Sequence, residues 1–399
     1  MNRLPLILAF GPGTWRPGQV CGSPRYHLWN LAALGWRVLY VEPPVRLPRR
    51  TAVWDAPDRP LSVLTPGGIP PFAVRWCLMR GAAELWREGV ARRLAREALR
   101  CLDGWRCEPD LLWFGSPWHG ALLRHLPRVP RAVHIYDELA RSPLLRPTPA
   151  TLLDEWERHL LANCDVALCS SRPQAEARRD LCPRTEVLEN GIPEQFLGES
   201  PRDPSGTGAA ELLTRIDNLP RPRVAYGGVA DLRLDPEPFL ALLDEERIGS
   251  VLFLGGRGAM LDRKLRRALR RHPRAFFTGP VPHGWYPALY RRADCLAIAH
   301  RDIHFTRAML PEKLSEYMGS GKPVVAMELP EIARVAREAD DPLAVRLARS
   351  PEDFVDQCVA ACRDTEPALA AERRRLAGRR TWGKLAAELD AVLRGMVRL

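Results

Sequence analysis

The sequence predicts an α/β protein made of two successive doubly wound domains. Short apolar runs alternate with helix-like segments, which is typical of a parallel sheet covered by helices on both faces. The alternation stops once, in a stretch with the composition of a linker, and then begins again. A length of 399 residues also fits two domains of ordinary size better than one core.

The apolar runs give the expected strands. In the first half of the chain they are residues 6–10, 37–44, 110–117, 131–138, 164–171 and 185–192. In the second half they are residues 223–230, 250–256, 274–281, 294–300, 322–327 and 343–348. We therefore expect a first domain at 1–198, a linker at 199–222, a second domain at 223–380 and a C-terminal helix at 381–399. Ligands of such folds bind beyond the carboxyl ends of the strands, so a cleft between the domains is the expected site.

The net charge of +11, from 59 Lys and Arg against 48 Asp and Glu, indicates an anionic partner. The chain lacks an aromatic and basic nucleic-acid module, which argues against nucleic acid as that partner. A helix over 86–100 has five arginines, which form either a solvated face or a face for anionic lipid. The apolar stripe of the C-terminal helix packs on a domain or, as the alternative, faces a membrane.

Two features of the sequence bear on the cellular location of the protein. Residues 4–10 are apolar, but Gly-Pro-Gly follows them in place of a cleavage site, so we interpret them as a buried strand. The ten cysteines are scattered without a C-x-x-C motif, and Cys358 and Cys362 have no second ligand pair nearby. We therefore expect reduced core cysteines, no metal site and a cytoplasmic protein.

The segment 305–332 has the clearest chemical pattern. Pro311 suits the start of a helix, and Gly319 and Gly321 suit its end, directly before a β-branched strand. Lys313 and Glu316 are three residues apart and share one face. A cation beside a carboxylate suits a ligand with both phosphate and diol, and the alternative is an ordinary surface ion pair.

The segment PEKLSEYMGSGKPVVA (311–326) resembles the donor-binding motif of the retaining glycosyltransferases with the two-domain GT-B fold, group 1 and family 4-like. RYHLWNLAALGWRVLYVEPP (25–44) and HIYDELA (134–140) are similar to segments of the branch that includes teichuronic-acid-type enzymes. Trp382 corresponds to a tryptophan common near the C-terminus of the family. The resemblance extends over nearly the whole chain and implies two Rossmann-like domains that face a central cleft.

The resemblance implies roles for donor-side residues in the second domain. Glu316 would accept hydrogen bonds from the donor ribose, and Lys313 with the N–H groups around Leu310 would meet the diphosphate. Gly227 and Gly228 would let the backbone approach the phosphates, and Arg257 would pair with a phosphate.

Two positions depart from the family pattern. A glutamate eight positions before Glu316 is replaced by Ala308, where Thr306 and Arg307 are the nearest polar side chains. The usual Arg and Lys pair after the first strand of the second domain is reduced to Arg233. Either Lys313, Arg257 and Arg307 together hold the diphosphate, or the site is degenerate.

The acceptor would meet the first domain. Gly13 follows the first strand, and Arg25, Tyr26 and His27 open the next helix. His27 is a candidate base, with a structural role as the alternative, and Asp137 ends a strand at the edge expected for acceptor contact. No D-x-D motif stands at a strand end, so we expect transfer without a metal and without a cofactor beyond the donor itself.

The predicted function is that of a hexosyltransferase of the EC 2.4 type, which moves a sugar from a nucleotide-diphosphate sugar to a hydroxyl acceptor with retention. The acceptor would be a cell-surface polysaccharide, a glycolipid or a small-molecule glycoside, and contact with the inner face of the cell membrane would be peripheral. One alternative is a nucleotide-sugar epimerase of the same fold. Another, suggested by Ala308, is a degenerate homologue that acts as a non-catalytic partner subunit.

Overall fold

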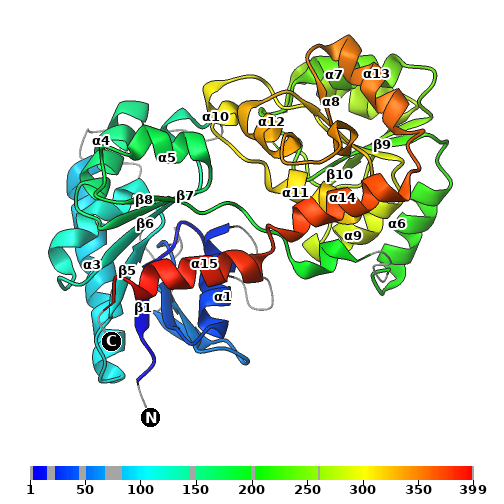
Figure 1. Cartoon of the computed structure of the whole chain (residues 1–399). Coiled ribbons are helices and arrows are strands. Elements are labelled where there is room, and N and C mark those ends of the chain that lie inside the picture. The colour runs from blue at the N-terminus through cyan, green and yellow to red at the C-terminus, as the bar shows by residue number, and fades with distance from the viewer. Residues whose placement is uncertain are drawn as a thin grey trace. The chain divides into compact units, whose positions relative to one another are not determined.

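The computed structural model describes residues 3–15, 23–44, 51–67, 83–143, 149–198, 203–258 and 261–397. The chain divides into two compact units (Figure 1). The first comprises Met1–Arg141, Leu145–Glu189 and Trp382–Leu399, and the second comprises Ser142–Leu144 and Asn190–Thr381. Residues 199–202 of the expected linker lie outside the described residues, and α6 (Thr207–Asp217) occupies much of the rest. The domain bounds given above stay a prediction.

In the part of the chain that the structure describes, the first unit has an eight-stranded sheet in the order β3-β4-β2-β1-β5-β6-β7-β8. Its neighbouring strands are parallel, except that β3 and β4 are antiparallel. The strands are β1 (Leu6–Phe10), β2 (Arg37–Val41), β3 (Ala52–Asp55), β4 (Leu61–Thr65), β5 (Leu111–Phe114), β6 (Arg131–Ile135), β7 (Val166–Cys169) and β8 (Thr185–Val187). The helices are α1 (Ser23–Ala33), α3 (Ala83–Gly104), η1 (Pro117–His125), η2 (Leu139–Arg141), α4 (Ala150–Leu161), α5 (Arg172–Arg178) and α15 (Trp382–Arg394).

Alternate residues of β1 pack on the two faces of this sheet. Leu6 and Leu8 belong to a core cluster with α3, η1 and α4, whereas Ile7 belongs to one with α1 and α15. Leu389 and Leu393 of the C-terminal stripe are buried in the second cluster, and α15 lies beside α1 (Figure 1). The tail therefore packs on the first unit, and its apolar stripe is not available to a membrane.

The second unit has, among its described residues, a six-stranded parallel sheet in the order β11-β10-β9-β12-β13-β14. The strands are β9 (Arg223–Gly227), β10 (Ser250–Leu254), β11 (Ala275–Phe277), β12 (Cys295–Ile298), β13 (Val324–Met327) and β14 (Val345–Ala348). The helices besides α6 are η3 (Glu194–Leu197), α7 (Pro236–Asp244), α8 (Arg263–Arg271), η4 (His283–Trp285), α9 (Tyr286–Arg291), α10 (His304–Arg307), α11 (Glu312–Ser320), α12 (Pro330–Ala336), η5 (Pro342–Ala344), α13 (Pro351–Ala361) and α14 (Pro367–Gly378). Tyr226 of β9 packs with α7, α8 and α13, and Ala225 packs with α9, α11 and α14.

The α/β class and the expected strands are confirmed: each predicted apolar run contains a strand. The short strands β3 and β4 were missed, because Asp58 and Pro60 between them give the region the composition of a turn. The eight cysteines within the described ranges are free. Among the described helices, none combines the length and apolar character that crossing a membrane requires.

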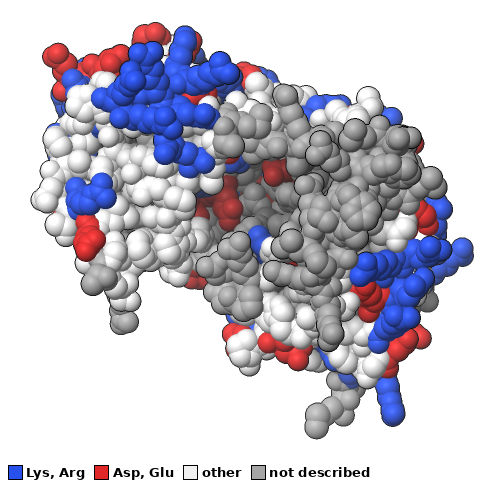
Figure 2. Space-filling model, turned by 180° about the vertical axis from the view of Figure 1, so that it is seen from behind, with Lys and Arg blue, Asp and Glu red and all other residues white. Residues whose placement is uncertain are grey.

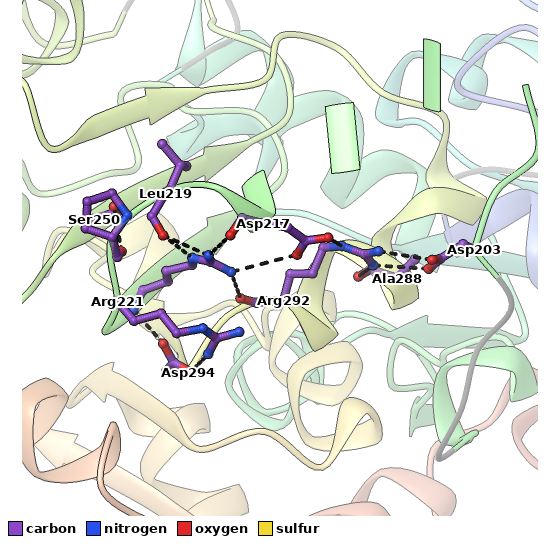
Figure 3. A network of polar contacts seen from close by, with 10 residues as sticks. Asp203, Asp217, Leu219, Arg221, Ser250, Ala288, Arg292 and Asp294 are labelled. Atoms are coloured by element: carbon purple, nitrogen blue, oxygen red, sulfur yellow. Dashed lines mark hydrogen bonds and ion pairs between the residues drawn. The ribbon is translucent and has the colours of Figure 1, made fainter. Parts of the chain in front are cut away.

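A polar network fixes the amino ends of the central strands in the second unit (Figure 3). The guanidinium of Arg292 pairs with Asp203 at 3.0 Å and with Asp217 of α6 at 3.1 Å. Arg223 is buried, and its Nε donates to the carbonyl of Leu219 at 3.0 Å. The carboxylate of Asp294 accepts from the Arg223 backbone N–H at 2.7 Å. The network joins the segment before β9 to the segment before β12, at the sheet edge opposite the carboxyl ends.

Replacing Arg223 should cost much more stability than replacing its neighbour Arg221. Arg223→Met removes a buried guanidinium and leaves the partly buried carbonyl of Leu219 without its two donors, so the free energy of unfolding should fall by about 2–4 kcal/mol. Arg221 pairs with Asp294 through an exposed side chain, so Arg221→Met should change it by less than about 1 kcal/mol. Urea denaturation measures both variants, and equal losses would contradict this role of Arg223.

Candidate functional site

The candidate site lies at the carboxyl ends of β9, β10 and β12, inside the second unit. From β9 the chain adds β10 and β11 on one side and β12 to β14 on the other, so the strand order reverses at β9. Parallel sheets bind ligands at the carboxyl edge of this switch point. Gly227 ends β9, Gly255 follows β10 and His300 follows β12, so these three segments border the site.

Two glycines allow close packing of the backbone there. A Cβ atom on Gly227 would lie 2.4 Å from the hydroxyl of Tyr290. Gly255 has a φ of +139°, and a Cβ atom there would lie 2.3 Å from the carbonyl oxygen of Gly228. A side chain at either position would displace the neighbouring segment.

Helix α11 presents its first turn to this edge. Pro311 is the N-cap residue and has no side-chain oxygen, so its side chain cannot cap the N–H groups of the first turn. Leu310 is buried in the core, and Gly321, with a φ of +75°, ends the helix. The sequence predicts Pro311 one position further into the helix and both Gly319 and Gly321 at its end. Gly321 does end the helix, whereas Gly319 lies within it.

Lys313 lies against the end of β9. Its Nζ donates to the hydroxyl of Tyr226 at 2.8 Å and lies 4.6 Å from the centre of that ring. Its Cε would lie 3.6 Å from a Cβ atom on Gly228. Burial, followed by the charge of Arg233, lowers the pKa of Lys313 to about 7. An anion that arrives beside Gly228 would favour the charged ammonium.

Arg233, which follows β9, is held by a carboxylate. Its Nη2 lies 2.7 Å from Oδ2 of Asp231, whose side chain is buried. The backbone N–H of Arg233 also donates to Asp231 at 3.0 Å. Arg233 is therefore partly neutralised, whereas the Nζ of Lys313 would lie 3.8 Å from a Cβ atom on Gly228.

Glu316 is buried and held by two donors. Its side chain is 8% exposed; Oε1 lies 2.7 Å from Nε2 of His283, and Oε2 accepts from the Tyr290 hydroxyl at 2.9 Å. Burial alone would lower the pKa of His283, but the hydrogen bond and charge of Glu316 outweigh it and raise the pKa above its ordinary value. The imidazolium of His283 is thereby favoured opposite the Glu316 carboxylate.

His283, Tyr226 and Tyr290 were missed in the sequence. Each is distant from Glu316 or Lys313 along the chain, and only the fold brings them together. A signal existed for His283, because it follows β11 in the loop GPVPHGW, at the carboxyl edge where ligand contacts are expected.

The other predicted donor-side residues each have contacts of their own, away from Glu316 and Lys313. Arg257 is exposed, and its guanidinium lies 5.0 Å from the centre of the Phe277 ring. Arg307 is exposed and pairs with Asp302 at 3.0 Å. Thr306 is fully buried, and its hydroxyl donates to the carbonyl of Arg301. The hydroxyl of Thr306 is thus already used in holding α10, and donor roles for these three residues stay predictions.

The predicted acceptor-side residues lie in the first unit. The carbonyl of Gly13 accepts from the Tyr40 hydroxyl at 2.6 Å, and the Arg25 guanidinium donates to the carbonyl of Thr14. Tyr26 stacks on Trp382 with ring centres 4.7 Å apart. Asp137 is half-buried just beyond β6. Their acceptor roles stay predictions.

His27 lies in the interior of the first unit. Its ring is 0% exposed and contacts Trp382 and His134 edge-on, at 4.9 and 5.3 Å between ring centres. Neither ring nitrogen has a hydrogen-bond partner among the described residues, and burial lowers the pKa of His27 well below its ordinary value. A base must reach the proton that it removes. This placement favours the structural role of His27 over the catalytic one.

Residues 238–364, which include Lys313 and Glu316, match the family model of the glycosyl transferases group 1. No curated protein matches the chain. A solved structure of trehalose-6-phosphate from E. coli bound with UDP-2-fluoro glucose is similar, with a TM-score of 0.70, 13% identity and coverage of 98% of this chain and 99% of that chain. The α,α-trehalose-phosphate synthase (UDP-forming) from Burkholderia vietnamiensis has a TM-score of 0.68 and 14% identity, with coverage of 98% and 97%.

These findings define the class of protein. The solved structures share the arrangement of two parallel Rossmann-like sheets, so the chain has the GT-B fold. The family match covers the segment that carries the candidate site. The chain is a glycosyltransferase of the GT-B fold.

Binding of a nucleoside diphosphate should take up a proton through Lys313. With a pKa of about 7, free Lys313 is mostly neutral at pH 8, and a bound phosphate favours its charged form. Affinity should therefore fall as the pH rises through about 7. Calorimetry at pH 8 in two buffers of different ionisation enthalpy should show uptake of about one proton.

Lys313→Met is the control for this proton uptake. The variant should bind at least about tenfold more weakly, because a charge-assisted contact with the phosphate is lost. Its binding should also take up no proton. The same uptake in the wild type and in Lys313→Met would assign the proton to another group.

Proposed function

We propose that the protein transfers a sugar from a nucleoside-diphosphate sugar to a hydroxyl group of an acceptor, with retention of configuration and without a metal ion. The observation that carries this proposal is the buried Glu316 carboxylate beside the Lys313 ammonium, at the carboxyl edge of the second sheet. The Glu316 carboxylate suits the ribose of a nucleotide, and the Lys313 ammonium suits its diphosphate.

Glu316 retains capacity for the ribose. Each carboxylate oxygen has two lone pairs, and His283 and Tyr290 use one on each oxygen. The remaining lone pairs can accept from the two hydroxyls of a ribose. Because its two protein donors fix the carboxylate plane, little rotational freedom is lost on binding.

The diphosphate is proposed to lie between Gly228, Lys313 and the first turn of α11. The lack of a side chain at Gly228 and of a capping oxygen on Pro311 supports this position. Arg257, exposed on the loop after β10, is a further cation for a phosphate oxygen. Negative charge grows on the leaving diphosphate, so these groups stabilise the transition state more than the ground state.

Retention fits attack on the face from which the diphosphate departs. The acceptor oxygen bonds to the anomeric carbon, the bond from that carbon to the phosphate oxygen breaks, and the acceptor proton passes to the departing diphosphate. This step requires no nucleophile from the protein. Gly13, Arg25, Tyr26 and Asp137 are the proposed acceptor contacts, because they lie in the first unit and outside the donor site.

Uridine diphosphate is the proposed nucleotide. Two solved structures of similar fold are described as bound with UDP-2-fluoro glucose and as UDP-forming. A third, from Burkholderia xenovorans in complex with glucose-6-phosphate, has a TM-score of 0.69 and 12% identity, with coverage of 98% of this chain and 100% of that chain. The proposed acceptor is a polysaccharide, a glycolipid, a small glycoside or a sugar phosphate.

One observation favours a second candidate, a non-catalytic partner subunit. Ala308 is buried and offers only a methyl group where the wider family has a glutamate. The intact contacts of Glu316 and Lys313 favour the catalytic proposal, because a subunit without a donor would have no need to bury these charges.

A thermal-shift screen with the diphosphates of uridine, guanosine, thymidine and cytidine tests the donor site. At about a hundred times its dissociation constant, the preferred nucleotide should raise the melting temperature of the wild type by about 5 °C or more. Glu316→Gln should lose most of this shift. The matched control Glu211→Gln, on an exposed face of α6, should keep it.

Two results would contradict the proposed function. No nucleotide stabilises the wild type, or Glu316→Gln is stabilised as much as Glu211→Gln. The first result would favour the partner subunit, and the second would remove Glu316 from the donor site.

A further inference from the structure

One face of helix α8 packs in the core of the second unit. Asp262 caps the helix by accepting from the backbone N–H groups of Lys264 and Leu265. Leu265 and Leu269 are buried in the core cluster that also holds α7 and α13. Because these two leucines are one turn apart, they fix the rotation of the helix and direct the opposite side to solvent.

The solvent side of α8 is entirely cationic. The exposed residues of the helix are Arg263, Lys264, Arg267, Arg270 and Arg271, which we name the α8 basic face. In Figure 2, blue side chains gather over this part of the molecule, at the upper left of the view. The sequence of the helix, RKLRRALRR, contains no acidic residue.

The α8 basic face lacks the neutralising partners that other helices of the chain have. Within the described residues, none of its five cations forms an ion pair or a hydrogen bond through its side chain. By contrast, Arg334 on α12 pairs with Glu331 at 3.0 Å and with Glu338 at 2.6 Å. Like charges one turn apart repel, so the face is less stable than a mixed one until an anionic partner covers it.

We propose that the α8 basic face binds an anionic lipid surface. Five cations on one side of a helix can reach a plane together, and each cation near an anionic membrane surface adds to the binding free energy. Since the leucines of α8 are buried, the helix has no apolar face to insert, and the contact is electrostatic. The contact is therefore sensitive to salt.

A single-stranded nucleic acid fits the same surface less well. Binding of that kind needs aromatic rings on which bases stack. The rings of the adjacent strand β11 are already covered, since Arg215 lies 5.1 Å from the centre of Phe276 and Arg257 lies 5.0 Å from that of Phe277.

The structure favours α8 over the helix predicted at 86–100. That helix belongs to α3, where Arg92, Arg96 and Arg100 are exposed at one-turn intervals. Acidic side chains on α3 reduce its positive charge, because Arg93 pairs with Glu97 at 2.9 Å. The matching spacing makes the α3 arginines a control of equal charge for Arg263, Arg267 and Arg271.

Co-sedimentation with vesicles of equimolar phosphatidylglycerol and phosphatidylcholine tests the proposal on the full chain. The wild type should bind these vesicles at low salt and should not bind phosphatidylcholine alone. The triple variant Arg263→Gln, Arg267→Gln, Arg271→Gln should bind at least about tenfold more weakly. The triple variant Arg92→Gln, Arg96→Gln, Arg100→Gln should change binding by less than about twofold. Circular dichroism melting shows that both variants are folded.

Three outcomes would overturn the proposal. The α8 variant binds as the wild type does, the α3 variant loses as much binding as the α8 variant, or the wild type binds a single-stranded polynucleotide and ignores the anionic vesicles. The test does not involve the donor, so its failure leaves the proposed transfer reaction unaffected.

Discussion

The burial of the Glu316 carboxylate is the constraint on which the site depends. A carboxylate with an 8% exposed side chain is stable only with donors at both oxygens, and His283 and Tyr290 supply them. His283 comes from η4 and Tyr290 from α9, so the carboxylate ties both segments to α11. The tight fit of Gly227 against the Tyr290 hydroxyl then fixes the end of β9 in the same assembly.

The second charge of the site is arranged differently. Lys313 donates to the hydroxyl of Tyr226 and has no carboxylate within an ion-pair distance among the described residues. Burial, followed by the charge of Arg233, lowers the pKa of Lys313 to about 7. A diphosphate would complete its charge compensation. The charge of Glu316 therefore has its hydrogen-bond donors before the nucleotide sugar binds, and its position is fixed. The charge of Lys313 gains an anionic partner only when the diphosphate binds, so its protonation depends on the ligand.

The sequence predicted the parts of the structure that depend on local pattern. The alternation of strands and helices, and the position of Lys313 and Glu316 three residues apart on one helix, follow from periodicity alone. The partners His283 and Tyr290 depend on tertiary contact, which one sequence does not encode locally. The burial of His27 had a local signal, since it lies one turn before the core residue Leu31 on α1. The α8 basic face also had a local signal in the sequence, its run of basic residues. Such a run alone does not show which side of the helix packs in the core.

The central claim is that Glu316 binds the donor ribose, and a comparison of uridine diphosphate with its 2′-deoxy analogue tests it directly. Calorimetry on the wild type and on Glu316→Gln forms a cycle in which the ribose hydroxyl and the carboxylate are removed separately and together. The wild type should bind the deoxy analogue about tenfold more weakly, and Glu316→Gln should bind both nucleotides equally. Equal affinity of the wild type for both nucleotides, or the same preference in the variant, would contradict it.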